Sequence, residues 1–297
     1  MKNYLKKFIT DPAARAGYIS KLDFLLSDKR YLKKKFRQKF GYKLNLKNPE
    51  TFNEKLQWLK IYDRKPEYTR MVDKYEAKKF VAQKIGEEYI IPTLGVWDAF
   101  DEIDFDALPD QFVLKCTHDS GGVTICRDKS KLDREIVKMD MNARLKRNYY
   151  WPGREWPYKN VPPRIIAEEY LENNEKEGLH DYKVWCFNGE PLFVQYISGR
   201  AGNCTYEGFY DRNWQFQNFT YLNPMVMYAV PKPGCLDELL ELSKKLSKDT
   251  SFLRCDFYIL PDGQIKFGEM TFYPMCGMEH WHPEKMDRTL GDKIVIK

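Results

Sequence analysis

The stretch FLRCDFYILPDGQIKFGEMTF, residues 252–272, predicts two strands joined by a tight turn. Asp-Gly at 262–263 is a strong signal for a two-residue hairpin turn, which places Pro261 opposite Gln264. Side chains alternate between the two faces of a strand, so one face of this hairpin is apolar and predicts part of the core. Its members are Leu253, Cys255, Phe257 and Ile259, with Met270 and Phe272 on the second strand.

The other face of the hairpin carries charge. The same register places Asp256 opposite Glu269 and Arg254 opposite Thr271. Two carboxylates directly across a ladder repel each other, and Mg²⁺, which typically takes one or two carboxylates plus phosphate oxygens, compensates for that repulsion. The alternative is an exposed salt-bridge cluster in which Arg254 neutralises the pair. The hairpin alone leaves both interpretations open.

A second stretch, VLKCTHDSGGVTIC at residues 113–126, predicts a strand with Lys115 among apolar residues, followed by a Gly-Gly loop. A lysine in such a strand extends its ammonium group to the surface, pairs with a carboxylate or contacts a ligand. A strand-borne lysine beside a glycine-rich loop, together with an arginine and a metal ion, is what a polyphosphate requires. The two stretches together therefore favour a phosphate-binding site.

Length and composition limit the class of protein. A chain of 297 residues with 43% hydrophobic and 31% charged residues is typical of a globular protein with one large or two moderate domains. We find no apolar run of about 18 residues that would span a bilayer. Residues 1–10 also lack the apolar centre of a secretory signal, so we expect a cytoplasmic protein. Seven cysteines without a CxxC pair predict buried free thiols.

The net charge of +6 is unevenly distributed, because residues 1–47 contain 14 Lys or Arg against 3 Asp or Glu. Residues 29–41 predict a basic amphipathic helix, with Leu32, Phe36 and Phe40 four positions apart and Gly41 as its stop. Such a helix either contacts an anionic partner, which is a membrane surface, an acidic glycan or a phosphorylated carrier, or is a solvated face of a packed helix. No nucleic-acid recognition module is apparent.

The remaining pattern predicts an α+β fold with mostly antiparallel sheets. Helices are expected from the capping box at Thr51 and Glu54, from Asp73 to before Gly86, after Ser130, and over 237–248. The predicted strands are 89–97, 111–118, 123–128, 164–171, 181–187 and 191–198, in addition to the hairpin at 252–272. Asn188-Gly189 predicts a second tight hairpin. Residues 149–164, which are aromatic and proline-rich, are expected to form a long surface connection.

Taken in order, these motifs resemble the ATP-grasp superfamily, over roughly the last three quarters of the chain. The resemblance begins at Asp73-Lys74, continues through VLKCTHDSGGV, and ends with the R-x-D of Arg254 and Asp256 and the strand GEMTF. Each motif alone is weak, but their order and separation are fairly specific. DKYEAKKF and FGEMTFYPMCG further resemble the TupA-like branch, which is associated with teichuronopeptide and other cell-surface polysaccharide synthesis.

The resemblance implies a fold of two mostly antiparallel α+β subdomains that enclose a nucleotide. The expected domains are a short basic helical segment at 1–70 and an ATP-grasp-like catalytic domain at 71–297. The resemblance also implies ATP and Mg²⁺ as cofactors. The chain differs from the family pattern at Thr271, where many members place an Asn that helps to hold a second metal, and in its short helical head.

The resemblance assigns roles residue by residue. Lys74 and Lys115 would hold the nucleotide phosphates, and the backbone of Ser120, Gly121 and Gly122 would close over them. Glu168, Glu169 and Leu171 look like the hinge that receives adenine, Asp181 looks like the residue that takes the ribose hydroxyls, and Lys183 is grouped with these nucleotide-binding residues. Asp256, Glu269 and Thr271 would form the metal site, while Arg254 and Lys115 would act on the transferred phosphoryl group.

Several of these residues also have a purely structural explanation. Glu168 and Glu169 would then be a strand end in water, Asp181 would pair with Lys183, and Lys74 would follow a helix N-cap. These alternatives stay open at the level of sequence.

The implied reaction is an ATP-dependent ligation in which a carboxylate forms an acyl phosphate and an amine displaces the phosphate. A uronic acid of a surface glycan, or of a nucleotide-linked precursor, is the expected carboxylate, and an amino acid is the expected amine. The inner face of the membrane is a possible place for this reaction, through the basic helix.

Three other classes of function compete with this interpretation. A glycosyltransferase would use a DxD motif, which Asp104-Phe105-Asp106 spells within an acidic loop. A small-molecule kinase would need the same ATP site and would stop after phosphoryl transfer. A non-catalytic glycan-binding or membrane-docking protein would use the basic head, but would leave the acidic hairpin without a purpose.

Overall fold

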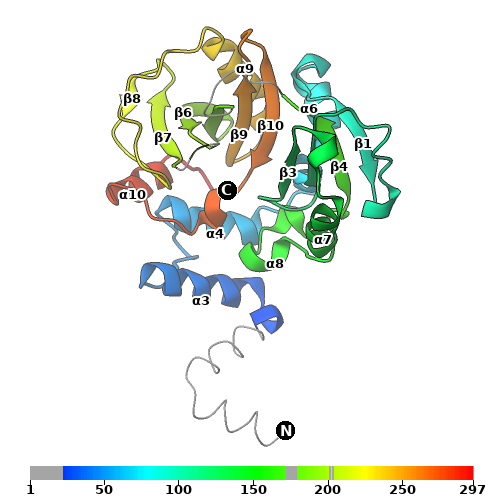
Figure 1. Cartoon of the computed structure of the whole chain (residues 1–297). Coiled ribbons are helices and arrows are strands. Elements are labelled where there is room, and N and C mark those ends of the chain that lie inside the picture. Colours follow the sequence, from blue (N-terminus) through cyan, green and yellow to red (C-terminus); the bar gives the residue numbers. More distant parts are fainter. Residues whose placement is uncertain (1–22, 172–178, 201, 203, 297) are drawn as a thin grey trace, which may run out of the picture. The chain divides into compact units, whose positions relative to one another are not determined.

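The computed structural model describes residues 23–171, 179–200, 202 and 204–296 (Figure 1). The chain divides into two compact units, Met1–Pro49 and Glu50–Lys297. The part of the predicted helical head at residues 1–22 lies outside the described residues. The predicted boundary of the catalytic domain between residues 70 and 71 stays a prediction.

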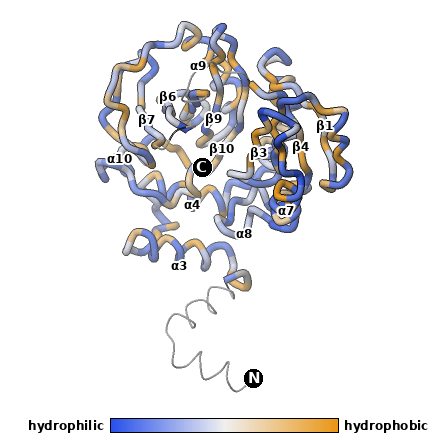
Figure 2. Tube along the Cα trace, viewed as in Figure 1, coloured by the Kyte–Doolittle hydropathy of each residue, from blue (hydrophilic) through white to orange (hydrophobic). Residues whose placement is uncertain are grey.

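The described part of the first unit contains a 3₁₀ turn (Asp23–Leu25) and helix α3 (Asp28–Phe40). The helix ends at Gly41, whose φ of 80° and N–H bond to the Arg37 carbonyl confirm the predicted stop. Leu32 and Phe36 are buried, and the rings of Phe36 and Phe40 lie 4.5 Å apart. Figure 2 shows hydrophilic and apolar residues interleaved along α3. The predicted amphipathic helix is confirmed.

The second unit combines helices with two antiparallel sheets, which confirms the predicted α+β fold. Its helices are α4 (Phe52–Tyr62), α5 (Glu67–Val72), α6 (Glu76–Ile85), α7 (Arg134–Leu145), α8 (Tyr150–Gly153), α9 (Leu236–Ser247) and α10 (Lys285–Gly291). The four-stranded sheet has the order β1 (Thr93–Trp97), β4 (Ile165–Glu169), β2 (Phe112–Cys116), β3 (Val123–Cys126). The six-stranded sheet has the order β10 (Ile265–Thr271), β9 (Phe252–Ile259), β5 (Asp181–Phe187), β6 (Glu190–Ser198), β7 (Tyr206–Asp211), β8 (Phe216–Gln217).

Local signals explain most of these elements. The capping box at Thr51 and Glu54 opens α4 as predicted. Asn188 and Gly189 both have positive φ, at 52° and 81°, and form the two-residue turn between β5 and β6. These are the conformations that a type I′ turn requires. All seven cysteines are free thiols, and four of them are buried.

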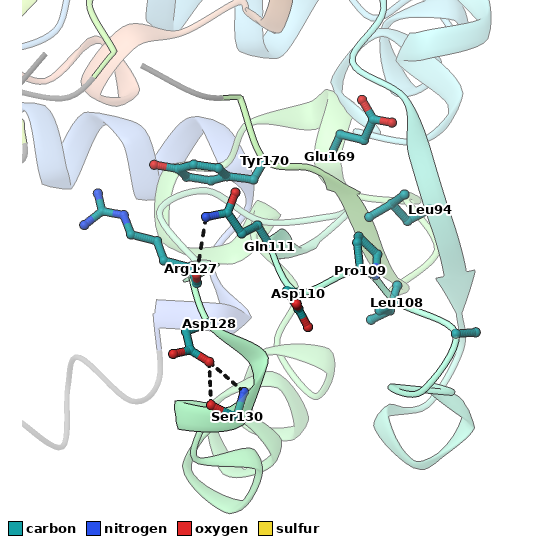
Figure 3. Close-up of a pocket in the computed structure, with 11 residues that line it drawn as sticks. Leu94, Leu108, Pro109, Asp110, Gln111, Arg127, Asp128, Ser130, Glu169 and Tyr170 are labelled. Carbon is teal, nitrogen blue, oxygen red and sulfur yellow. Dashed lines mark hydrogen bonds between the residues drawn. The ribbon is translucent and has the colours of Figure 1, made fainter. Parts of the chain in front are cut away.

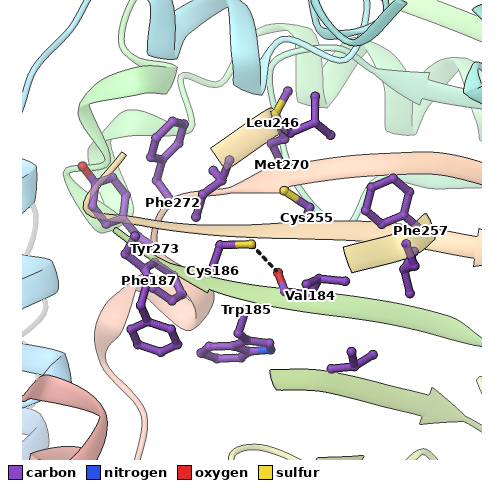
Figure 4. Close-up of a cluster of buried hydrophobic side chains, with 14 of the residues drawn as sticks. Val184, Trp185, Cys186, Phe187, Leu246, Cys255, Phe257, Met270, Phe272 and Tyr273 are labelled. Atoms are coloured by element: carbon purple, nitrogen blue, oxygen red, sulfur yellow. Dashed lines mark hydrogen bonds between the residues drawn. The ribbon is translucent and has the colours of Figure 1, made fainter. Parts of the chain in front are cut away.

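The larger core surrounds the six-stranded sheet. The face that carries Val184, Cys255 and Met270 contributes to a single apolar cluster with helix α9, which supplies Leu246 (Figure 4). Phe52 on α4 and Trp281 belong to an aromatic group around Trp185, in which neighbouring ring centroids lie 5.4–5.8 Å apart. Aromatic pairs at such separations add stability beyond the area they bury. These contacts fix β5 and β9, the strands from which the charged residues project.

The smaller core lies on one face of the four-stranded sheet. Phe112, Leu114 and Cys116 of β2 are fully buried and belong to one cluster with Val137 and Met141 of α7. Because side chains alternate along a strand, Lys115 projects from the opposite face. The position of Lys115 therefore follows from the apolar residues on either side of it.

The hairpin between β9 and β10 departs from the predicted turn. The Leu260 N–H bonds to the Gln264 carbonyl at 2.8 Å, so Leu260, and not Pro261, faces Gln264. The loop therefore has three residues, with a positive φ of 86° at Gly263. A three-residue loop of this kind is a type I turn followed by a left-handed residue, and glycine takes the left-handed position without strain. The prediction of a two-residue turn is wrong.

A β-bulge at Gly268 restores the predicted register beyond the turn. Phe267 pairs with Phe257, whereas Glu269 pairs with Asp256, so one extra residue lies between them on β10. The predicted pairs of Asp256 with Glu269, and of Arg254 with Thr271, are confirmed. A Cβ at Gly268 would lie 3.1 Å from the Asp256 carbonyl oxygen. A glycine at the bulge allows this close approach.

Candidate active site

Lys115 forms an ion pair with Glu168, which lies on the neighbouring strand β4. Glu168 is 5% exposed and also pairs with Lys78 of α6, at 2.6 Å between Nζ and Oε1. Burial raises the pKa of Glu168, but the charges of Lys115 and Lys78 outweigh burial and lower it below its usual 4.5. The buried Glu168 carboxylate is thus paired with two cations. The alternative that Glu168 lies in water at the end of a strand is therefore wrong. Its predicted contact with adenine stays a prediction.

The glycine loop lies next to Lys74, whose ammonium group donates a hydrogen bond to the Asp119 carbonyl. Gly121 has a φ of 81°, which suits a residue without a Cβ. A Cβ at Gly122 would lie 2.4 Å from the Arg144 guanidinium. Arg144 also pairs with Asp119 at 3.0 Å. The structure therefore brings Lys74 and the predicted loop together, and Arg144 holds the loop from α7.

Lys78 and Arg144 make contacts that sequence reasoning missed. Lys78 lies four residues after Lys74, on the side of α6 that also contains the buried residues Ala77 and Val81. A lysine on a buried helix face is a signal that could have indicated a buried partner. Arg144 is four residues from Asp140 and pairs with it at 2.7 Å, a spacing that predicts only a surface ion pair. Its contact with the glycine loop depends on tertiary structure.

The charged residues of the six-stranded sheet form a row across three neighbouring strands. Glu269 lies opposite Asp256, which lies opposite Lys183. Arg254 donates two hydrogen bonds of 2.7 Å to the Asp256 carboxylate, and Lys183 forms an ion pair with the same group. Burial raises the pKa of Asp256, but the charges of Arg254 and Lys183 outweigh burial and lower it. Asp256 is therefore a buried carboxylate with its charge neutralised by two cations.

Glu269 is the accessible carboxylate of this row. Its side chain is 38% exposed, and its contact with the Arg254 guanidinium is long, at 3.5 Å. The same guanidinium donates a hydrogen bond of 3.1 Å to the Thr271 hydroxyl. The alternative of an exposed salt-bridge cluster is thus wrong for Asp256, which is 2% exposed.

These residues fit a metal ion that is shared with a phosphate. Within the described ranges no three His, Cys, Asp or Glu residues lie together as a metal cluster. Mg²⁺ needs only one or two carboxylates when phosphates supply the other oxygens. Glu269 offers an accessible carboxylate with only one long contact, to Arg254, whereas Asp256 would first have to exchange one of its two cations for the metal.

Asp181 and Lys183 lie 3.7 Å apart, so the predicted alternative pairing is present. The closer partner of Asp181 is Arg200, at 2.5 Å. Asp181 itself is 3% exposed. The predicted contact of Asp181 with a ribose would therefore replace the Arg200 pair. Leu171 is half-buried and is the last described residue before the gap at 172–178.

Glu169 lies on the face of β4 opposite to that of Glu168, because it pairs with Phe112 of the smaller core. There it borders a hollow of about 1080 Å³ that is open to solvent (Figure 3). Figure 3 shows Tyr170, Gln111 and Arg127 along one wall and Leu108 along the other. The structure thus separates Glu169 from Lys115, although the sequence groups Glu168 with Glu169 in one hinge.

In the DxD motif that a glycosyltransferase would use, the first aspartate is hydrogen-bonded to the backbone of its own loop. One oxygen of Asp104 accepts hydrogen bonds from the backbone N–H groups of Asp106 and Ala107, at 3.0 and 3.3 Å. This is the pattern of a side chain that closes its own turn. Asp104 therefore acts as a turn residue in this structure.

We expect the protein to lose stability in acid through Glu168 and Asp256. Both carboxyls have a folded pKa below the usual values of 4.5 and 3.8, so their contribution to stability is complete above those values and is lost as the pH falls below them. Thermal unfolding followed between about pH 6 and about pH 3 measures this effect. A midpoint that stays constant over that range would contradict the ion pairs described here.

None of the helices in the described residues is both long and apolar enough to cross a membrane.

Comparisons with known proteins place this geometry in a family. The family described as TupA-like ATPgrasp matches residues 54–295. No curated protein matches the chain. An L-amino acid ligase from Bacillus licheniformis has a similar structure, with 12% identity, a TM-score of 0.50, and coverage of 91% of this chain and 62% of the other.

Two further solved structures resemble smaller parts of the chain. A D-alanine–D-alanine ligase from Bacillus anthracis complexed with ATP has 17% identity and a TM-score of 0.38, over 68% of this chain and 53% of the other. The ATP-grasp ligase PsnB, complexed with minimal precursor, Mg and ADP, has 11% identity and a TM-score of 0.37, over 74% and 57%.

The chain spans between 53% and 62% of the length of these three structures. At 12% identity and a TM-score of 0.50, the likeness to the L-amino acid ligase concerns the fold alone. The family match extends over most of the chain, from α4 to the end of the second unit. The chain therefore belongs to the TupA-like ATP-grasp family.

Proposed function

We propose that the protein is an ATP- and Mg²⁺-dependent carboxylate–amine ligase. The observation that carries the proposal is the row of Glu269, Asp256 and Lys183, with Arg254 beside it, in a chain of the ATP-grasp family. Such a row offers one accessible carboxylate for a metal and several cations for phosphate oxygens.

The proposed nucleotide site uses the residues that the family resemblance assigns. Lys74, Lys115 and the loop of Ser120, Gly121 and Gly122 hold the phosphates, and Lys183 is grouped with the nucleotide-binding residues. The hinge of Glu168, Glu169 and Leu171 receives adenine, and Asp181 takes the ribose. Asp256, Glu269 and Thr271 hold the metal, and Arg254 and Lys115 act on the transferred phosphoryl group. Mg²⁺, when bound, neutralises charge on the phosphate oxygens.

The doubled ion pairs support this assignment. Glu168 is paired with both Lys115 and Lys78, so Lys115 can turn to a phosphate while Lys78 still neutralises Glu168. Asp256 is likewise paired with Arg254 and Lys183. Removing the only partner of a buried charge is costly, about 3–5 kcal/mol. A second cation at each carboxylate removes that obstacle to ligand binding.

The proposed reaction joins a carboxylate to an amine. The carboxylate substrate attacks the γ-phosphoryl group to form an acyl phosphate, and the amine then displaces phosphate to give an amide. Positioning of the substrates and neutralisation of charge are enough to catalyse such a reaction, so no nucleophilic side chain is needed. We propose a uronic acid of a cell-surface polysaccharide, or of its nucleotide-linked precursor, as the carboxylate, and an amino acid as the amine.

Trapping with hydroxylamine tests this function without the need for the natural amine. The protein is incubated with Mg²⁺, ATP and a panel of free and nucleotide-linked uronic acids, and both ADP and hydroxamate are measured. We expect ADP and hydroxamate in equal amounts with at least one uronic acid. ADP without hydroxamate would point to a kinase, and no ADP with any uronic acid would contradict the proposal.

We also propose that the first unit contacts an anionic glycan, at the inner face of the membrane in the cytoplasm. A groove of about 620 Å³ in this unit is lined by Lys33, Lys34, Arg37, Gln38, Lys43 and Leu44. Lys33, Arg37 and Lys43 are exposed and form no ion pair with a described residue, whereas Lys34 pairs with Asp23. The apolar side chains Leu32 and Phe36 are buried, so α3 does not offer them to a bilayer.

Charge reversal tests this contact. We expect the triple change of Lys33, Arg37 and Lys43 to Glu to weaken binding to an acidic polysaccharide at low salt by at least about tenfold, or about 1.4 kcal/mol. The matched control changes the exposed Lys232, Lys245 and Lys248 of the second unit to Glu, which alters the net charge equally. An equal loss in both variants would assign the effect to net charge, and binding to anionic vesicles alone would favour the membrane.

A further inference from the structure

The glycine loop, residues 117–122, joins β2 to β3. Its first residue is fixed through the backbone, because the Thr117 N–H donates to the Arg164 carbonyl at 2.9 Å and the Thr117 carbonyl accepts from the Lys74 N–H at 3.1 Å. Its last two residues are glycines, which have more conformational freedom than any other residue. The contacts of the residues in between therefore determine where the loop lies.

Asp119 links the glycine loop to two cations. Its carbonyl accepts a hydrogen bond from the Lys74 ammonium group, and its carboxylate pairs with the Arg144 guanidinium of α7, at 3.0 Å between Oδ2 and the nearest guanidinium nitrogen. Asp119 is 6% exposed. Among the residues that the structure describes, Arg144 is the one cation that pairs with this carboxylate, and Oδ1 has no hydrogen-bond partner. Arg144 is thus the single counter-ion of a buried charge.

This single pairing distinguishes Asp119 from Glu168 and Asp256, each of which pairs with two cations. Removing the partner of a buried charge leaves that charge uncompensated, which is strongly unfavourable. The glycine loop can avoid this state by moving Asp119 into water, since the two glycines that follow offer little resistance. Loss of Arg144 is therefore expected to displace the loop, together with the carbonyl that holds Lys74.

Arg144 is itself held from several sides. Its Nε donates a hydrogen bond of 2.7 Å to Asp140, one turn earlier on α7, and its carbonyl oxygen lies 3.1 Å from Nε2 of the buried His118. A Cβ at Gly122 would lie 2.4–2.6 Å from three atoms of the guanidinium group, so this group lies flat against the loop backbone and only glycine leaves room for it. Helix α7 packs on the four-stranded sheet through the smaller core (Figure 1). The guanidinium group therefore projects from a rigid element.

We propose that Arg144 is a positioning residue that sets the affinity of the protein for ATP without touching it. This inference rests on the proposed ligase function and concerns its phosphate contacts. Arg144 acts through Asp119, which keeps the backbone of residues 120–122 in place and its own carbonyl against the Lys74 ammonium group. An ammonium group has three donors, so two remain on Lys74 for phosphate oxygens. A loop that is ordered before the ligand arrives lowers the entropy cost of binding.

Calorimetric titration with ATP in the presence of Mg²⁺ tests this proposal in wild type, Arg144→Ala, Asp119→Asn and the double variant. We expect Arg144→Ala to raise the Kd for ATP by at least about tenfold, because the loop must then be ordered on binding. The two residues act through one ion pair, so the double variant is expected to bind within about twofold of Arg144→Ala. The matched control Arg147→Ala, at an exposed arginine three residues further along, is expected to bind as wild type does.

The results separate this proposal from the ligase function. A residue needed only for folding would lower the urea midpoint and leave the Kd of the folded protein unchanged, so an unchanged Kd in Arg144→Ala overturns the role of Arg144 alone. A double variant that binds clearly more weakly than Arg144→Ala does the same, because the two residues would then act independently. No binding of ATP to wild type contradicts the nucleotide site itself, and this proposal with it.

A milder variant keeps the proposal testable if Arg144→Ala does not fold. Arg144→Lys retains the positive charge, but an ammonium group is not planar and cannot lie flat on the loop while it pairs with both Asp119 and Asp140. We then expect the Kd for ATP to rise by at least about threefold, since only part of the contact is kept. An unchanged Kd in Arg144→Lys would overturn the proposal.

Discussion

Glu269→Gln is expected to lose at least about 100-fold in ATP turnover, which is the usual scale for removing one group that stabilises developing charge. The physical reason is that Glu269 is the accessible carboxylate of the row, with a side chain 38% exposed. Its long contact of 3.5 Å with Arg254 contributes little to stability, so the fold is expected to be unaffected.

Two measurements check this prediction. ADP release is followed with the uronic acid panel, and the thermal midpoint is compared with that of wild type. We expect a midpoint within about 2 °C of wild type, as for a surface substitution. Normal turnover in a folded Glu269→Gln protein would show that the metal site lies elsewhere.

Asp256→Asn is expected to destabilise the protein by about 3–5 kcal/mol, because removing one partner of a buried ion pair leaves uncompensated charge. Asp256 is 2% exposed and accepts two hydrogen bonds of 2.7 Å from Arg254. Lys183 pairs with the same carboxylate, so Arg254 and Lys183 both lose their nearest counter-ion. Asp256 and Glu269 face each other on neighbouring strands, but only Asp256 is buried. We therefore expect the loss of Asp256, and not that of Glu269, to destabilise the fold.

Urea unfolding of Asp256→Asn and of Glu269→Gln measures this difference directly. Glu269→Gln serves as the control, because it also replaces a carboxylate by an amide, on the neighbouring strand. Equal unfolding midpoints for the two variants would contradict the buried ion pair of Asp256 with Arg254 and Lys183.

The hairpin shows how far local patterns determine a site. Alternation along 252–272 predicts correctly that Asp256 faces Glu269, although the predicted turn is one residue too short. The three-residue loop and the bulge at Gly268 each shift the register by one, in opposite directions. An Asp-Gly pair is compatible with both loop lengths, so the sequence does not distinguish them.

The partners of Lys115 illustrate what local patterns omit. Its position in an apolar strand is predicted correctly, but its pairing with Glu168 joins residues 53 positions apart. Lys78 reaches the same carboxylate from a helix. Ion pairs of this kind depend on how sheets and helices pack, and a single sequence contains no periodic signal for them.

The stretch between α7 and β4 has no periodic pattern at all. Residues 149–164 contain prolines and large rings, and such a stretch predicts a surface connection. The structure instead buries Glu155 next to Lys60 and Cys276, which lie far away in the sequence. The Glu155 carboxylate accepts a hydrogen bond from the Cys276 thiol, and Lys60 donates hydrogen bonds to the backbone carbonyls of Gly153 and Cys276. Only these tertiary contacts show that the stretch is partly buried.

Nucleotide binding is the central claim, and a thermal-shift comparison tests it most directly. The midpoint of wild type is measured with Mg²⁺ and ATP, and separately with Mn²⁺ and UDP-sugars, because a ligand that binds the folded state raises the midpoint. We predict a rise with Mg²⁺ and ATP that is lost in Glu269→Gln. A rise with a UDP-sugar and none with ATP would contradict nucleotide binding of this kind and would favour glycosyl transfer.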